Sequence, residues 1–220
     1  ADRMGTGSSA ADDRARLVVM VSGSGTNLQA ILDACGQGPG AEAGSRPGPR
    51  LDASVVLVIS NVADAYALTR AREAGVPTAV LPHEGRDRAE YDTELAYEAR
   101  IVGADLVVLA GWNRVLTQHF LDHHRVVNLH PAKPGAFPGL GAIERAFEAW
   151  TDGRISSGGV MVHFVPDEGV DSGPVVAWEE VPFLDGDTLE AFEARVHAVE
   201  HRVLVESIAK VLAELRAARP

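Results

Sequence analysis

Asn128 and His130 are the residues of this 220-residue chain whose types and spacing most directly indicate chemistry. They continue an apolar run that begins at Val126, and side chains two positions apart in an extended strand point to the same face. The pair therefore predicts a neutral amide donor beside a titratable imidazole at the end of a strand. Ligand clefts of open α/β sheets lie beyond the carboxyl ends of the strands, so we expect the pair to face a cleft. A hydrogen-bonded structural histidine is the alternative for His130 taken alone.

A carboxylate for this histidine is available in the loop of residues 167–174, which reads Asp-Glu-Gly-Val-Asp-Ser-Gly-Pro. Its glycines and proline predict a tight bend that aims Asp171 into the cleft, although turn formation is itself a sufficient reason for such a sequence. Asn128, His130 and Asp171 are therefore the candidate catalytic residues. The chain has no Gly-x-Ser-x-Gly motif, which argues against a serine hydrolase of that class.

The turn of residues 23–27, Gly-Ser-Gly-Thr-Asn, indicates a site for an anion. Glycine lets a ligand approach the backbone closely, and the helix expected after the turn, with Thr26 or Asn27 as its N-cap, offers free N–H groups and a positive dipole end. Leu28 stands where a dinucleotide fingerprint needs its third glycine, and no acid follows the second strand, so a nicotinamide site is disfavoured. We expect a site of monophosphate size, with a purely structural turn as the alternative.

Two further patterns receive a structural interpretation. His119 and His123 have the i, i+4 spacing of a helical metal pair, but no third ligand lies nearby in the sequence, so we expect a solvated helix surface and no metal. Cys35 is the single cysteine and cannot form an internal disulfide; we expect a buried structural thiol in a reducing compartment.

The composition indicates an ordinary soluble globular domain, with 46% hydrophobic and 23% charged residues. A net charge of −11 argues against broad non-specific binding to nucleic acid. No apolar run approaches the ~18 residues of a membrane span, and no segment resembles a signal peptide. We therefore expect a cytoplasmic protein that acts on small molecules without nucleic-acid or membrane partners, as a monomer or a homodimer.

Strands and helices alternate along most of the chain. Strands are predicted at 17–21, 54–59, 78–81, 106–110 and 126–129, and helices at 28–35, 64–74 and 87–102. This order predicts an α/β fold with a doubly wound, mostly parallel sheet.

The pattern changes in the last third of the chain. Strands predicted at 160–165 and 175–181 are joined by a loop alone, which suits an antiparallel pair, and an apolar stripe from Phe192 to Leu215 predicts a long C-terminal helix. Residues 1–16 are small, polar and glycine-rich and are expected to be a disordered tail or a cloning remnant. Residues 17–220 are expected to form a single domain.

Four motifs in order resemble the folate-dependent formyltransferases, from about Leu17 to the C-terminal helix. Residues 21–31 are similar to the family's substrate-phosphate loop, and Asn128-Leu129-His130-Pro131 to its catalytic Asn-x-His-Pro. Asp171-Ser172-Gly173-Pro174 is similar to its aspartate loop, and residues 110–116, Ala-Gly-Trp-Asn-Arg-Val-Leu, to its folate-binding segment. The resemblance implies the Rossmann-like formyltransferase fold and transfer of a formyl group from 10-formyltetrahydrofolate to the amine of glycinamide ribonucleotide, in purine biosynthesis.

The same resemblance implies roles for individual residues. Those expected at the substrate are Gly25, Thr26 and Asn27 on the ribose 5-phosphate and Glu200 on the glycinamide end. Those expected at the folate are Arg88, Arg114, Val115, Leu116 and Asn128, with the loop of residues 166–171. From the residue pattern alone, Glu200 is a charge at the edge of the apolar stripe of the C-terminal helix.

The chain departs from the family pattern at two places. After His-Pro the family usually continues Ser-Leu-Leu-Pro, whereas residues 132–135 read Ala-Lys-Pro-Gly, which predicts a different loop path. Asn113 stands where methionine is common, which predicts a less apolar pocket wall.

The expected mechanism is attack of the substrate amine on the formyl carbon, which gives a tetrahedral intermediate with a negatively charged oxygen. Asn128 and protonated His130 would stabilise that oxygen, and Asp171 would keep His130 charged and accept or relay the amine proton. Three alternatives remain at this point: a formyltetrahydrofolate hydrolase, a formyltransferase for another amine, and a non-catalytic binder of a phosphorylated metabolite.

Overall fold

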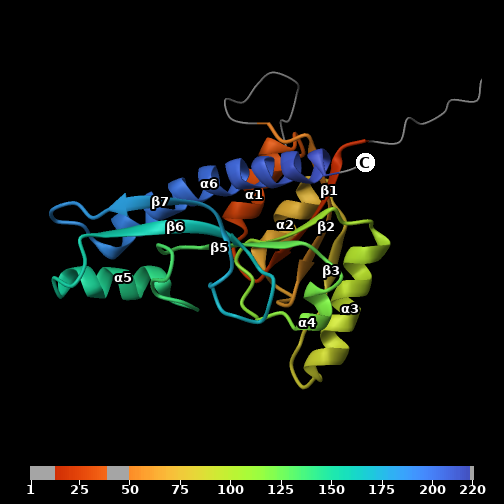
Figure 1. Ribbon diagram of the computed structural model, residues 1–220, viewed down its shortest axis with the longest axis horizontal. Coiled ribbons are helices and arrows are strands. Elements are labelled where there is room, and N and C mark those ends of the chain that lie inside the picture. Colours follow the sequence, from red (N-terminus) through yellow and green to blue (C-terminus); the bar gives the residue numbers. More distant parts are fainter. Residues whose placement is uncertain (1–12, 39–49, 219–220) are drawn as a thin grey trace, which may run out of the picture.

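A single seven-stranded sheet organises the computed structural model, which describes residues 13–38 and 50–218 (Figure 1). The strands are β1 (Ala15–Val21), β2 (Ala53–Ser60), β3 (Thr78–Val80), β4 (Leu106–Leu109), β5 (Val126–His130), β6 (Ser157–Phe164) and β7 (Val175–Pro182). The helices are α1 (Thr26–Ala34), α2 (Tyr66–Glu73), α3 (Arg88–Ile101), α4 (Gln118–Leu121), α5 (Ala142–Thr151) and α6 (Leu189–Ala217).

The strand order is β3-β2-β1-β4-β5-β6-β7, and β1 to β5 run parallel. β6 lies antiparallel to β5 and to β7. The mostly parallel sheet, the antiparallel pair and the long C-terminal helix are confirmed. The chain turns from β1 toward β2 on one side and toward β4 on the other, so β1 and β4 form the switch point where such folds place ligands.

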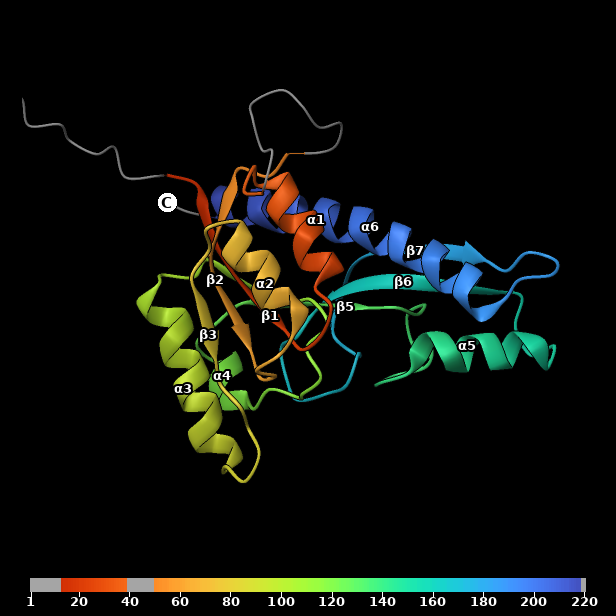
Figure 2. The same ribbon diagram turned by 180° about the vertical axis from the view of Figure 1, so that it is seen from behind.

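Two apolar layers enclose the parallel strands. Alternate residues of β1 point into them: Leu17, Val19 and Val21 join the core shared with α1, α2 and α6, whereas Val18 and Met20 join the core shared with α3 and α4. β1 is therefore apolar on both faces, as a strand covered on both sides requires. Figures 1 and 2 show α6 running along β6 and β7, with α5 on the other side of β6 in both views.

The first strand begins earlier than the apolar run predicts. Ala15 and Arg16 already pair with Ala53 and Ser54 of β2, and the Arg16 backbone N–H donates to a carboxylate oxygen of Asp105. The expected boundary at residue 17 therefore falls two residues late, because ladder pairing extends past the apolar residues. The expected tail lies, for residues 1–12, outside the described residues.

Two local features differ from the sequence expectation. The N-cap of α1 is Gly25, with φ of 74°, in place of Thr26 or Asn27, and no side chain caps this helix. The helix α5 was not predicted, because no element was assigned between the strands expected at 126–129 and 160–165.

The single cysteine is buried, as expected. Cys35 is 5% exposed within the core beneath α1, and burial raises the pKa of its thiol to about 12. In the part of the chain that the structure describes, none of the helices has the length and apolar character of a membrane span.

Candidate active site

A cleft of about 460 Å³ opens at the carboxyl ends of β1, β4 and β5. This volume lies in the range of small-molecule sites, about 300–1,000 Å³. Ser22 ties the loops there together: its hydroxyl donates to Asn61 Oδ1 at 2.6 Å and accepts from the Asn113 N–H at 3.0 Å. Of the residues expected at the site, those lining the cleft are Gly25, Thr26, Asn27, Arg114, Val115, Leu116, Asn128, His130, Asp171 and Glu200.

Asp171 joins the two polar residues of β5. Its Oδ1 accepts from Asn128 Nδ2 at 3.0 Å, and its Oδ2 lies 3.3 Å from His130 Nδ1 and accepts from the Gly139 N–H at 2.7 Å. Asp171 itself adopts φ of 50°, in the left-handed region that non-glycine residues seldom occupy. The expected convergence of Asn128, His130 and Asp171 is present, and the aspartate loop achieves it with a strained backbone.

His130 is 3% exposed and faces an oxygen at each ring nitrogen. Nδ1 faces Asp171 Oδ2, and Nε2 lies 3.3 Å from the Ala136 carbonyl oxygen. A neutral imidazole carries one N–H, so only the imidazolium can donate to both oxygens. An imidazolium at this position would therefore be hydrogen-bonded through both nitrogens.

His163 is a second buried histidine at this site, 2% exposed, and sequence reasoning missed it. It lies on β6 opposite Asn128, its Nε2 is 3.2 Å from Asn128 Nδ2 and 3.5 Å from Asp171 Oδ1, and its Nδ1 is 2.7 Å from the Phe164 carbonyl. With Nδ1 donating to that carbonyl, a neutral His163 accepts from Asn128, whereas a protonated His163 donates to Asp171. The only sequence signal was a polar residue inside an apolar strand, and the strand pairing that gives it meaning was unknown.

The environment of Asp171 keeps its carboxylate ionised. Burial acts to raise the pKa, but hydrogen bonds from His163 and the Gly139 N–H, together with the charge of His130, outweigh it and leave the pKa below its ordinary value. Hydrogen bonds to a carboxylate favour its charged form. A group that is ionised at neutral pH is available to hold a proton on His130 or to receive one.

The glycine turn, which follows β1, lines the same cleft, and β4 separates β1 from the β5 strand of this cluster. A Cβ on Gly25 would meet the Ala67 Cβ at 2.6 Å, so both its positive φ and its packing require glycine. Arg70, from α2, donates from Nε to the Ser24 carbonyl at 2.9 Å and brings a positive charge to the turn. The uncapped start of α1 and this guanidinium together suit an anion.

Glu200 is buried, at 4% exposure, which corrects its interpretation from the residue pattern as a charge at the helix edge. Its Oε2 accepts from Asn27 Nδ2 at 3.2 Å and lies 2.7 Å from His197 Nδ1. The hydrogen bond to Glu200 is the largest influence on His197 and raises the pKa of the imidazole, while burial opposes it. His197 also lines the cleft, and its i−3 spacing from Glu200 on one helix was the signal that could have identified it.

Residues 114–117, the segment expected to face the folate, are held in place by contacts with α3. The Arg114 guanidinium carbon lies 4.5 Å from the centre of the Tyr91 ring, and its Nε lies 3.8 Å from Asp92 Oδ1. Asp92, fully buried, also accepts from the Thr117 N–H through Oδ2. Val115 and Leu116 lie between these two anchors, so the segment that lines the cleft is held at both ends.

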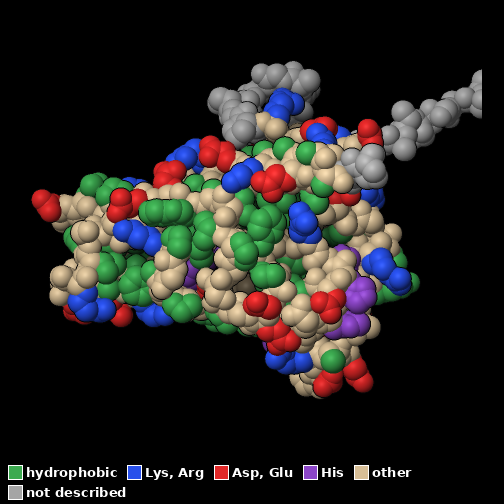
Figure 3. Space-filling view, in the orientation of Figure 1, with side chains coloured by type: hydrophobic (Ala, Val, Ile, Leu, Met, Phe, Trp, Pro, Cys, Tyr) green, Lys and Arg blue, Asp and Glu red, His purple; other side chains and the backbone are tan. Residues whose placement is uncertain are grey.

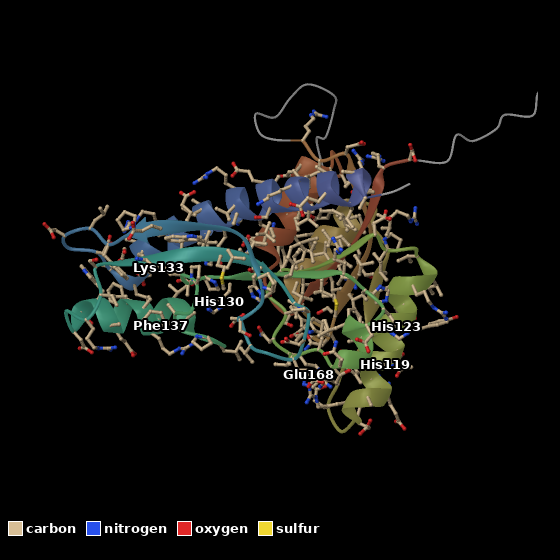
Figure 4. The ribbon with its side chains drawn as sticks, viewed as in Figure 1. His119, His123, His130, Lys133, Phe137 and Glu168 are labelled. Atoms are coloured by element: carbon tan, nitrogen blue, oxygen red, sulfur yellow. The ribbon has the colours of Figure 1, made fainter. Side chains whose placement is uncertain are left out.

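Arg88 is placed differently from the other residues expected at the folate. It does not line the cleft; its side chain is 54% exposed, donates to the Val115 carbonyl at 3.3 Å and lies 3.5 Å from Glu168 Oε2. Glu168 Oε1 in turn accepts from the Gln118 N–H at 3.0 Å. Arg88 and Glu168 therefore connect the aspartate loop to this segment, and Figure 4 shows Glu168 on the side of α3 and α4.

The loop that departs from the family pattern begins with a β-turn. Pro134 and Gly135, the latter with φ of 76°, occupy its centre, and the Ala136 N–H donates to the Lys133 carbonyl at 2.9 Å, as in a type II turn. The Lys133 ammonium donates to Ser157 Oγ at 2.5 Å and Glu180 Oε1 at 2.9 Å, which ties the turn to β6 and β7. The altered sequence thus has its own anchor.

The second half of this loop, residues 137–141, is held by one arginine. Arg145 Nη2 lies within hydrogen-bond distance of the carbonyl oxygens of Phe137 (2.9 Å), Pro138 (2.8 Å), Gly139 (3.3 Å) and Leu140 (2.9 Å). Figure 4 shows His130 between the loop residues Lys133 and Phe137 on one side and Glu168 on the other.

The surface around the site combines apolar and charged areas. Figure 3 shows apolar side chains gathered over the middle of this face and a separate group of histidines beside α4. His119 and His123 belong to that exposed group, and their rings lie 5.0 Å apart. Among the described residues, no set of three or more His, Cys, Asp or Glu side chains is arranged to hold a metal ion.

Comparisons with known proteins place this geometry in context. A family model described as formyl transferase matches residues 15–208. Phosphoribosylglycinamide formyltransferase of Schizosaccharomyces pombe is 42% identical over 213 residues, which cover 91% of this chain and 98% of that protein. The Escherichia coli protein of the same name is 39% identical over 190 residues, covering 85% of this chain and 82% of its own.

Solved structures agree with these sequence relatives. Glycinamide ribonucleotide transformylase 1 from Geobacillus kaustophilus matches with a TM-score of 0.79 and 36% identity, covering 90% of this chain and 99% of that one. The enzyme of the same name from Symbiobacterium toebii matches with a TM-score of 0.76 and 41% identity, covering 89% and 86%.

Proposed function

The chain belongs to the formyl transferase family, and from this premise we propose that it transfers the formyl group of 10-formyltetrahydrofolate to the amine of N1-(5-phospho-D-ribosyl)glycinamide. The protein is a formyltransferase of purine biosynthesis, like the relatives that it matches over most of its length. The observation that carries the residue-level proposal is the contact of Asp171 with both Asn128 and His130 in a cleft that also reaches the glycine turn.

The reaction needs a group that stabilises developing negative charge. When the amine nitrogen attacks the formyl carbon, the carbonyl oxygen becomes an oxyanion, and the imidazolium of His130 is the cationic donor beside it. In the ligand-free protein Asp171 Oδ2 and the Ala136 carbonyl oxygen face its two ring nitrogens. An N–H of the imidazolium therefore reaches the oxyanion only when one of these contacts is exchanged for the substrate, whereas its positive charge stabilises the oxyanion without any exchange.

The amide of Asn128 is the second donor in this proposal. In the ligand-free arrangement its two hydrogens face Asp171 Oδ1 and His163 Nε2. Donation to the oxyanion therefore requires one of these bonds to be exchanged for the substrate. The bond to His163 is the one proposed for exchange, because His163 Nε2 can donate to Asp171 Oδ1, 3.5 Å away, in place of accepting from Asn128.

Asp171 is the proposed acceptor of the proton that the amine loses on attack, directly or through water. Its pKa below the ordinary value keeps it ionised at neutral pH, and its contact with His130 Nδ1 offers a path to the leaving group. Proton transfer to the tetrahydrofolate nitrogen then completes the collapse of the intermediate. The C–N bond to the folate breaks as the new formamide bond is retained.

The ends of the substrate are assigned to two other clusters. The 5-phosphate is proposed at the start of α1, where Gly25, Thr26 and Asn27 offer backbone N–H groups and Arg70 adds a charge. The glycinamide amine is proposed at Glu200, whose buried carboxylate suits a cationic or hydrogen-bonding amine. Because Asn27 donates to Glu200, the two subsites are physically connected.

One assay separates this function from the alternatives. Protein, 10-formyltetrahydrofolate and glycinamide ribonucleotide are mixed, and release of tetrahydrofolate is followed. We expect release that depends on the ribonucleotide. Release without any amine would indicate a hydrolase, release with a different amine alone would indicate another formyltransferase, and no release under any condition would indicate a metabolite binder.

A further inference from the structure

Arg145 lies outside the cleft but holds a segment that two catalytic side chains need. It is half-buried in the first two turns of α5, and its Nε also donates to the Gly141 carbonyl at 3.2 Å. Together with the four carbonyls that Nη2 approaches, five consecutive peptide oxygens of residues 137–141 face one guanidinium. Nη2 has two hydrogens, so these bonds are shared and the attraction is largely between a charge and a ring of dipoles.

A ring of carbonyl dipoles pointing at one place is unfavourable unless a cation sits there. The backbone of this segment is also unusual, because Phe137 has φ of 46° and Gly139 has φ of 82°. Non-glycine residues in the left-handed region persist only where their surroundings impose it. Arg145 is the group that imposes it here, since it contacts the carbonyl of Phe137 and of each residue after it up to Gly141.

The segment delivers contacts to the catalytic cluster at both of its sides. The Gly139 N–H donates to Asp171 Oδ2 at 2.7 Å, on the same oxygen that faces His130 Nδ1. The Ala136 carbonyl, immediately before the clamped residues, receives His130 Nε2 at 3.3 Å. Movement of this loop would therefore alter the partner of each ring nitrogen of His130.

We propose that Arg145 is a positioning residue that acts through the 137–141 backbone to set the Asp171–His130 pair. This inference rests on the proposed function for its kinetic readout. It assigns no contact between Arg145 and either substrate, so the residue changes turnover and leaves substrate binding largely intact.

The experiment compares Arg145→Met, Arg145→Lys and a control, Arg154→Met, which removes an exposed arginine just after the same helix. We expect Arg145→Met to lower kcat by about tenfold or more, the scale that small misplacements of reacting groups produce, with KM for both substrates within about twofold. Arg145→Lys keeps the charge among the carbonyls and should recover part of the loss. Arg154→Met should retain wild-type kcat. An equal loss in Arg154→Met, or wild-type kcat in Arg145→Met, overturns the proposal.

A double-mutant comparison tests the route of the effect. If Arg145 acts through Asp171, then Arg145→Met added to Asp171→Asn lowers kcat little further, because the pair it positions is already broken. Full additivity of the two losses overturns this route. If Arg145→Met fails to fold, judged by its thermal transition, Arg145→Lys alone decides: an intermediate kcat with unchanged KM supports the proposal and wild-type kcat refutes it.

A measurement without turnover separates this inference from the proposed function. Hydrogen exchange of the Gly139 amide in the ligand-free protein should become faster in Arg145→Met and stay unchanged in Arg154→Met, whatever reaction the protein catalyses. If the exchange rate of the Gly139 amide is unchanged in Arg145→Met, Arg145 does not hold the 137–141 backbone. Absence of formyl transfer in the wild-type protein, with faster exchange in the variant, refutes the proposed function alone.

Discussion

Asn128 and Asp171 are joined by a 3.0 Å hydrogen bond from the amide Nδ2 to the carboxylate Oδ1. The proposed oxyanion donor and the proposed proton acceptor therefore hold each other in the ligand-free protein. Because of this contact the two residues act as a coupled pair, and their substitutions are expected to be non-additive.

Asn128→Ala is expected to lower kcat by roughly 10²–10³, the loss found when one oxyanion donor is removed, with a much smaller change in KM. Asp171→Asn should also lower kcat strongly, because it removes the proton acceptor and the partner of His130. Steady-state kinetics with both substrates measure the two effects. Near-wild-type kcat in both variants would remove these residues from the mechanism.

His163→Phe should shift the acid limb of the kcat profile to higher pH. Burial acts to raise the pKa of Asp171, and the largest opposing influence is the hydrogen bond from His163. Without that bond, the pKa of Asp171 rises, so the carboxylate becomes protonated at a higher pH and activity is lost earlier on acidification. His124→Gln, on a histidine outside the cleft, is the control and should keep the wild-type profile.

Arg70→Met should weaken binding of the phosphorylated substrate. A hydrogen bond to a charged group contributes about 1.5–3 kcal/mol, so KM for the ribonucleotide is expected to rise roughly tenfold or more. Arg72→Met, on the exposed side of the same helix, is the matched control. The dephosphorylated riboside provides the discriminating measurement: if Arg70→Met impairs it equally, Arg70 does not act on the phosphate.

His197→Gln should reduce the pH dependence of KM for the amine substrate. The pKa of His197 is raised above its ordinary value, chiefly by the hydrogen bond to Glu200. As pH rises through the folded-state value, the imidazolium loses its charge and competes less for the Glu200 carboxylate, so KM should fall. The same deprotonation removes the stabilisation that the charged pair gives the fold, which is fully present only below the unfolded-state pKa. A KM profile identical in wild type and variant would exclude this coupling.

Cys35 should resist thiol reagents in the folded protein. Its pKa of about 12, raised by burial, leaves almost no thiolate at pH 8. Labelling with a chromogenic disulfide is expected to be slow in buffer and rapid after denaturation. Fast labelling of the native protein would contradict the burial of this side chain.

Much of the fold follows from short-range patterns in the sequence. Apolar runs such as Leu17–Val21 predict strands covered on both faces, and their alternation with helices leads to a parallel sheet. The strand ends were less predictable, because Ala15 and Arg16 belong to β1 through pairing with β2 and not through their own character.

Contacts between segments far apart in the chain could not be predicted from residue spacing. Asn128 and His130 could be paired by the strand period, but His163 reaches them through an antiparallel pairing of β5 with β6 that no spacing encodes. The hydrogen bond from Asn27 to Glu200 likewise joins residues 173 positions apart in the chain. Arg145 gave no sequence signal, because its partners are peptide carbonyls and carry no residue identity.

Because Arg145 binds peptide carbonyls, the amino-acid sequence of the loop that it holds is free to vary at some positions. A guanidinium that recognises peptide oxygens makes no demand on the side chains of Pro138 or Leu140, and Leu140 is 72% exposed. Substitutions there leave the bonds to Arg145 available, whereas Gly139 and Gly141 are constrained by their positive φ. The side chains of Pro138 and Leu140 can therefore change, and with them the ligand selectivity at the rim of the cleft. The position of His130 relative to Asp171 is preserved.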